Sequence, residues 1–100
     1  MTEGQPLKIL LAEDVHMVRG ALAALLEKQP DFEVVAQTER GDEIVPAALE
    51  HHPDVAVIDA DLPGIDGVSA ARLLREHLPL CQTLILIGME VPGLVARCVA

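Results

Sequence analysis

Short apolar runs alternate along this chain with longer stretches in which apolar residues recur every three or four positions. Apolar, β-branched runs bounded by turn residues are typical of buried strands, and the three-to-four spacing is typical of helices with one buried face. The pattern predicts four strands, at residues 7–12, 32–38, 55–58 and 83–87. It predicts helices at residues 16–29, 41–52 and 66–77, and a loop at residues 88–93.

Strands that alternate with helices through short connections form right-handed βαβ units, which build a parallel sheet with helices on both faces. We therefore predict an α/β fold of the flavodoxin-like, doubly wound type, a three-layer α/β/α arrangement with strand order 2-1-3-4. Residues 94–100 predict the beginning of a further helix, so the fifth strand and last helix of this fold are expected to be missing from the chain. The expected organisation is a single, C-terminally incomplete domain over residues 1–100.

Particular residues restrict where one predicted strand lies in the sheet and where one predicted helix begins. Glu33 and Gln37 interrupt the apolar character of the strand at 32–38, which favours the edge of the sheet. Pro46 has no amide hydrogen, so a helix that begins near Gly41 accommodates it only in the first turn.

Charge and cysteine content exclude several classes of function. The 16 acidic and 7 basic residues give a formal net charge of −9 at pH 7, which argues against direct binding of nucleic acid or of an anionic membrane surface. No uncharged apolar window is long enough to span a membrane and the first residues lack the features of a signal peptide, so we expect a cytoplasmic location. Cys81 and Cys98 lack metal-ligand spacing and are expected to be reduced.

Carboxylates follow two of the predicted strands at the point where each strand ends. Glu13 and Asp14 come directly after the first strand, and Asp59 ends the third. In the order 2-1-3-4 these strands are neighbours, so their carboxyl ends meet at the topological switch point. Converging carboxylates repel one another without a cation, and oxygen ligands of this kind suit Mg²⁺. A carboxylate beside Mg²⁺ can act as a nucleophile toward phosphorus and give an aspartyl phosphate.

The acid pair and the turn Asp59-Ala-Asp-Leu-Pro-Gly-Ile-Asp-Gly67 resemble the receiver (CheY-like) domain of bacterial response regulators. The resemblance extends from Lys8 to about Ala100. The segment Leu-Leu-Ala-Glu-Asp-Val-His-Met-Val-Arg19 is most similar to the corresponding segment in receivers of the NarL/FixJ family, which precede a LuxR-type helix-turn-helix domain.

This resemblance implies a two-component phosphorelay in which Asp59 accepts a phosphoryl group from a phosphohistidine of a sensor histidine kinase. Asp14 and Asp59 would bind Mg²⁺ through their side chains, Glu13 would act partly through water, and the backbone carbonyl of Asp61 would supply another ligand. The active protein would form a homodimer and control transcription, contacting DNA only through a C-terminal output domain absent from this chain. The receiver itself would not be an enzyme.

Further residues of the turn and of the next helix have expected structural roles. By the same resemblance, Pro63 and Gly64 would shape the loop, and Gly67 would let the next helix start close to it. The side chains of Asp61 and Asp66 are expected to serve turn and cap chemistry. His16 is expected at an exposed helix start and Arg19 on a solvated helix face.

The chain departs from the family pattern at two positions, and two alternative functions remain open. Receivers usually carry Thr or Ser at the end of the fourth strand, whereas this position falls at Ile87, and the Lys at the end of their fifth strand is not reached. Ile87 favours an unphosphorylated receiver-like module that acts by dimerisation or partner docking. The motif Asp59-Ala-Asp61 also resembles haloacid dehalogenase-type phosphatases, with Asp59 as nucleophile and Asp61 as acid/base. That interpretation leaves the acid pair without a role.

Overall fold

The computed structural model describes residues 4–87 together with the backbone of residues 95–99. Its strands are β1 (Leu7–Ala12), β2 (Phe32–Thr38), β3 (Val55–Asp59), β4 (Gln82–Ile87) and β5 (Val95–Val99). Its helices are α1 (His16–Glu27), the short 3₁₀ helix η1 (Gly41–Glu43), α2 (Ile44–His51) and α3 (Gly67–His77). None of the helices among these residues is long and apolar enough to cross a membrane.

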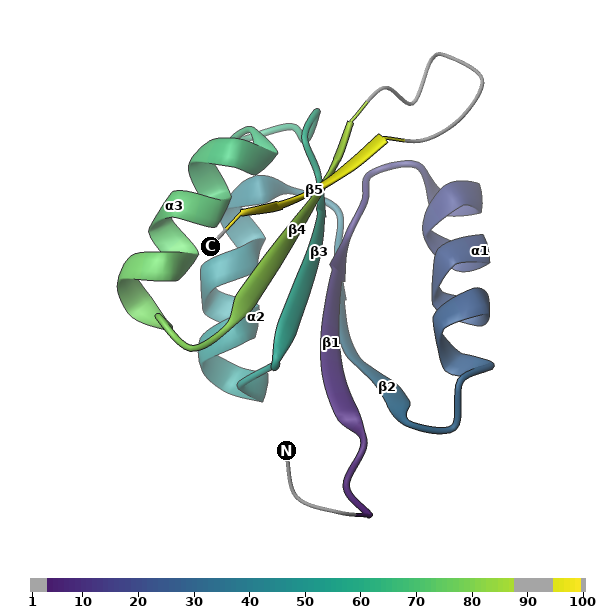
Figure 1. The fold of residues 1–100 in the computed structure, drawn as a ribbon. Coiled ribbons are helices and arrows are strands. Elements are labelled where there is room, and N and C mark those ends of the chain that lie inside the picture. Colours follow the sequence, from purple (N-terminus) through teal and green to yellow (C-terminus); the bar gives the residue numbers. More distant parts are fainter. Residues whose placement is uncertain (1–3, 88–94, 100) are drawn as a thin grey trace.

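The strands form one sheet in the order β2-β1-β3-β4-β5, in which the first four run parallel. Helices α2 and α3 cover one face of this sheet and α1 lies on the other (Figure 1). The predicted α/β fold and the predicted order 2-1-3-4 are confirmed. The predicted edge position of β2 is confirmed as well.

The core consists of two apolar layers, one on each face of the sheet. Leu10 and Ala12 point toward α2 and α3, whereas Ile9 and Leu11 belong to the layer under α1, because successive side chains of a strand point to opposite faces. A strand buried on both faces needs apolar residues throughout, and this explains the continuous run at residues 7–12.

The helix limits follow local chemistry. Pro46 is the third residue of α2, so the prediction that it falls in the first turn is confirmed. Asp66 caps α3, since its Oδ1 accepts a hydrogen bond of 2.9 Å from the amide of Ser69, and the predicted cap role is confirmed. That hydrogen bond holds the pKa of Asp66 below its usual range.

Residues 95–99 form a strand, so the helix predicted for residues 94–100 is wrong over this range. Strand β5 pairs antiparallel with β4, with Val95 opposite Ile87 and Val99 opposite Thr83. A segment of five residues is too short for its apolar pattern to distinguish a helix from a strand. Pairing with the main chain of β4 favours the strand. The sheet thus has a fifth strand, of antiparallel direction. The loop predicted at residues 88–93 lies outside the described residues.

Candidate functional site

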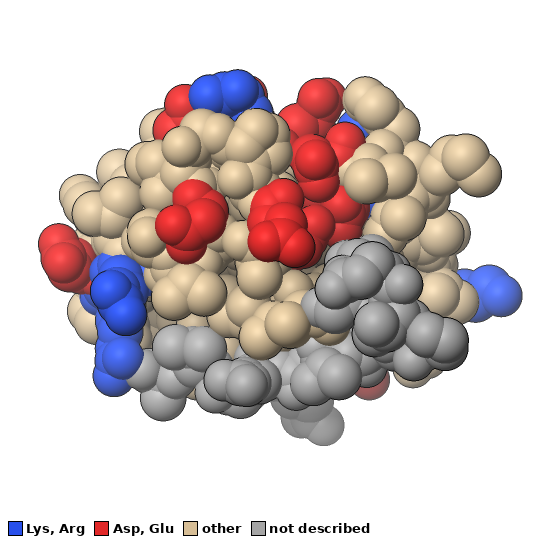
Figure 2. Space-filling view, turned by 90° about the horizontal axis from the view of Figure 1, so that it is seen from above, with Lys and Arg blue, Asp and Glu red and all other residues tan. Residues whose placement is uncertain are grey.

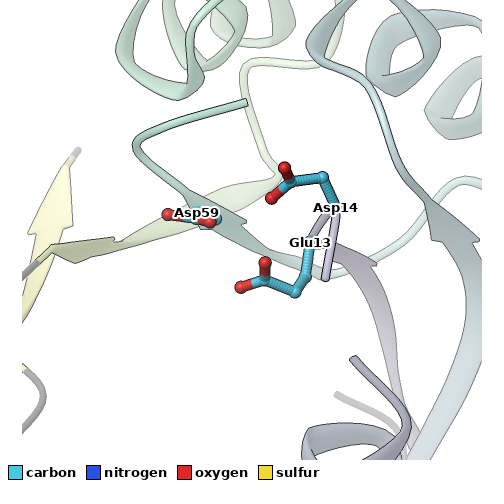
Figure 3. A group of neighbouring side chains, drawn as sticks. All are labelled: Glu13, Asp14 and Asp59. Carbon is cyan, nitrogen blue, oxygen red and sulfur yellow. The ribbon is translucent and has the colours of Figure 1, made fainter. Parts of the chain in front are cut away.

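The three predicted carboxylates meet at the ends of neighbouring strands. Glu13 and Asp14 follow β1, Asp59 is the last residue of β3, and the two strands pair in register with Ala12 opposite Ile58. One carboxylate oxygen of each side chain lies within 4.8 Å of the others. Figure 3 shows the three side chains gathered at these strand ends. The sequence pattern correctly predicted that they converge.

Burial makes the electrostatics of this cluster unusual. Glu13 is 0% exposed and Asp59 is 4% exposed, while Asp14 is partly open to solvent. The pKa of Glu13 is raised to about 7, mainly by burial and further by neighbouring Asp59 and Asp14, against the opposing effect of a 3.0 Å hydrogen bond from the amide of Val15. Near neutral pH Glu13 is therefore partly protonated, whereas an ordinary glutamate would be ionised.

The donor set fits a hard divalent cation. Oε2 of Glu13 accepts the hydrogen bond from Val15, but the buried Oε1 has no hydrogen-bond partner. Buried polar atoms are normally paired, so an orphaned carboxylate oxygen beside two further carboxylates indicates a ligand position. Oxygen donors of this kind suit Mg²⁺. Acidic side chains also gather on this face of the molecule, with Lys and Arg toward its margins (Figure 2).

The loop after β3 is held close to the following helix. Oδ1 of Asp59 accepts a 3.1 Å hydrogen bond from the amide of Asp61, and the amide of Gly67 donates to the carbonyl of Ala60 at 2.9 Å. A Cβ atom on Gly67 would overlap the carbonyl oxygen of Asp59. The expected role of Gly67, a helix start close to the loop, is confirmed, and Gly64 adopts a positive φ of 80° in the turn.

Ile87 lies where the sequence placed it, as the last residue of β4. Asp59 is opposite Leu86, and the amide of Ala60 donates to the carbonyl of Leu86 at 3.0 Å, so Ile87 is next to the end of β3. Its half-buried side chain has no hydroxyl. The departure from the usual Thr or Ser is therefore present at the last residue of β4, whose side chain packs against the core layer under α2 and α3.

The sequence pattern did not indicate that Arg19 contacts the loop that carries Glu13. The expectation that it lies on a solvated helix face is wrong, because its side chain is only 14% exposed and Nη1 donates to the carbonyl oxygen of Glu13 at 2.9 Å. His16 is exposed at the helix start as expected, with its side chain 73% exposed. Arg19 follows His16 by three residues, the spacing at which helical side chains meet, and this was the available signal.

Comparison with known proteins gives one consistent family. The response regulator receiver domain family matches residues 9–99. The chain is 42% identical over 72 residues to the transcriptional regulatory protein LiaR of Bacillus subtilis (strain 168), covering 72% of this chain and 34% of LiaR. It is 34% identical over 93 residues to the transcriptional regulatory protein DesR of the same organism, covering 93% of this chain and 46% of DesR.

A solved structure agrees with these relatives. The crystal structure of a LuxR-family two-component response regulator from Aurantimonas sp. SI85-9A1 superposes with a TM-score of 0.77 at 32% identity, covering 81% of this chain and 58% of that one. The chain spans less than half the length of the two curated relatives. Given the family match over residues 9–99, the parallel strand order and the carboxylates at the strand ends, this chain belongs to the response regulator receiver domain family.

Proposed function

We propose that this receiver accepts a phosphoryl group on Asp59 from a phosphohistidine of a sensor histidine kinase, in a transfer that depends on Mg²⁺. The observation that carries the proposal is the buried, unpartnered Oε1 of Glu13 within a cluster that contains Asp14 and Asp59. Neighbouring carboxylates in such a site repel one another, and a bound cation would relieve that repulsion.

Each residue of the cluster has a role in this proposal. An oxygen of Asp59 attacks phosphorus, a P–O bond forms as the P–N bond of the phosphohistidine breaks, and the imidazole takes the leaving electron pair. The amide of Asp61 orients the Asp59 carboxylate. Glu13, Asp14, Asp59 and the backbone carbonyl of Asp61 would hold Mg²⁺, which would neutralise the charge on the transferred phosphoryl oxygens.

The consequence for the longer protein is proposed from its relatives. LiaR and DesR are transcriptional regulators, and this chain corresponds to less than half of each. We propose that phosphorylation at Asp59 promotes a homodimer and thereby DNA binding by a C-terminal output domain, in the cytoplasm. Because Ile87 supplies no hydroxyl to the phosphoryl group, coupling between phosphorylation and dimerisation is expected to be weak.

The test is the intact mass of the chain after incubation with Mg²⁺ and acetyl phosphate. We expect one added phosphoryl group that requires Mg²⁺, is lost in Asp59→Asn and persists in Asp61→Asn. Catalytic release of phosphate from a monoester, lost in Asp61→Asn, would instead support the phosphatase alternative.

Ile87 supports a second candidate function, the unphosphorylated interaction module. In that case a folded sample takes no phosphoryl group, and its dimerisation constant is the same with and without acetyl phosphate and in Asp59→Asn. Sedimentation equilibrium of these samples separates the two functions.

A further inference from the structure

The side chain of Arg19 joins α1 to the loop that carries two of the carboxylates. Its Nη1 donates to the carbonyl oxygen of Glu13 at 2.9 Å, and its Nη2 lies 2.8 Å from Nδ1 of His16. The same Nη2 lies 3.8 Å from Oε2 of Glu39, just beyond β2. A guanidinium offers several donors in a rigid planar fork, and here they reach the loop after β1, the first residue of α1 and the residue after β2.

The carbonyl that Arg19 holds belongs to the peptide between Glu13 and Asp14. Because a peptide is planar, fixing that oxygen fixes the direction in which the chain enters Asp14. On its other side, the amide of Glu13 donates to the carbonyl of Thr38 at 3.0 Å. The main chain of Glu13 is therefore held from both sides, by β2 and by Arg19.

The charge of Arg19 is directed away from the carboxylates of the cluster. Among the described residues its partners are a main-chain carbonyl, an imidazole nitrogen and the carboxylate of Glu39. Burial, the amide of Val15 and the neighbouring Asp59 and Asp14 set the pKa of Glu13. The guanidinium thus orients the loop without replacing the cation that the cluster lacks.

The contacts continue to the loop after β3. The amides of Glu39 and Arg40 donate to the carboxylate of Glu43 at 3.0 and 3.2 Å, and the amide of Gly41 donates to the carbonyl of Pro63 at 3.0 Å. Arg19 is therefore linked through the end of β2 to the turn that follows Asp59.

From this arrangement we propose that Arg19 is a positioning residue for the metal site, which sets the affinity for Mg²⁺ by orienting the peptide between Glu13 and Asp14. The inference rests on the proposed function in taking Mg²⁺ as the cation. Partners that orient metal ligands typically change metal affinity by about tenfold or more when they are removed. Arg19 acts on the ligands and not on the reacting phosphorus, so its loss is expected to change the Mg²⁺ requirement and not the maximal rate.

The experiment compares Arg19→Met with Arg72→Met, which removes the same charge from an exposed position of α3. Mg²⁺ is titrated at pH 8 into labelled protein, and the amide resonances of Ala60 and Asp61 are followed by NMR. We expect the half-saturating Mg²⁺ concentration to rise about tenfold in Arg19→Met and to stay within about twofold of wild type in Arg72→Met. The phosphorylation rate at saturating Mg²⁺ is expected to stay within about threefold of wild type in both.

Wild-type Mg²⁺ affinity in folded Arg19→Met would overturn the proposal, and so would a lower rate at saturating Mg²⁺ with unchanged affinity. Glu39→Gln is the second variant, since it loosens the outer end of the guanidinium and leaves the bond to Glu13 in place. It is expected to weaken Mg²⁺ binding by about threefold, with an effect that is not additive with Arg19→Met. If Arg19→Met does not fold, wild-type Mg²⁺ affinity in Glu39→Gln overturns the proposal.

The outcomes also separate this inference from the proposed function. If wild type binds Mg²⁺ but takes no phosphoryl group, the proposed function fails, while the role of Arg19 is still decided by the Mg²⁺ titration. If wild type binds no Mg²⁺, both fail.

Discussion

The buried carboxylates of Glu13 and Asp59 lie side by side across the boundary between β1 and β3, with oxygens within 4.8 Å of each other. Two buried acids at this separation cannot both be charged at ordinary cost. Either a proton or a cation must accompany them, and the choice between the two governs the behaviour of the site.

The stability of the cation-free protein should fall as pH rises toward 8. A carboxyl whose pKa is raised on folding binds more protons in the folded state, and the pKa of Glu13 rises from 4.5 to about 7. Its contribution is therefore fully present below pH 4.5 and lost as pH rises through 7, by on the order of 3 kcal/mol over that whole range. Urea unfolding between pH 5.5 and 8 tests this, followed by circular dichroism because the chain has no Trp or Tyr.

The matched variant for the pH effect is Glu13→Gln, which removes the titrating group and keeps its shape. It should lose most of the pH dependence and be more stable than wild type at pH 8 without Mg²⁺. Equal slopes of stability against pH in the two proteins would contradict the assignment to Glu13.

Mg²⁺ should stabilise the folded protein through Asp14. A concentration ten times the dissociation constant adds about 1.4 kcal/mol to the free energy of unfolding. Asp14→Asn is expected to abolish the gain, whereas Asp61→Asn keeps it because that residue is proposed to contribute its main-chain carbonyl. Thermal unfolding with Mg²⁺ and with a chelator distinguishes the two variants, and loss of the gain in both would refute the ligand assignment.

Gly67→Ala should destabilise the protein by about 2 kcal/mol or more, because the new methyl group would overlap main-chain atoms of Asp59 and Ala60. Gly20 is the control: it is exposed in α1, and a Cβ there meets nothing within 4 Å. Gly20→Ala is expected to stabilise the helix by about 0.5–1 kcal/mol. Denaturant midpoints of the two variants should therefore move in opposite directions.

Ile87→Thr should strengthen the response to phosphorylation. The variant places a hydroxyl at the end of β4, next to the end of β3, whereas Ile87→Val changes the side chain without adding one. We expect acetyl phosphate to raise the melting temperature of Ile87→Thr more than that of wild type or of Ile87→Val. The same increment in all three would show that this position does not couple to the phosphoryl group.

The parallel sheet could be predicted because strand and helix periods are local properties of the sequence. The convergence of Glu13 and Asp59 followed from strand order alone, since both stand where a strand ends. Arg19 could not be placed in the same way, because a carbonyl and Glu39, twenty residues further along the chain, determine its position. The strand at 95–99 likewise depends on the main chain of β4 and not on its own pattern.

The antiparallel pairing of β5 also limits what can join the sheet. The outer edge of β4, at residues Thr83 to Ile87, is already paired with β5. A further strand can therefore join the sheet in two ways. It either pairs with the outer edge of β5 or displaces β5 from β4, which exposes the amides of that edge to solvent. Hydrogen exchange at β4 amides consequently reports strand replacement independently of any chemistry at Asp59.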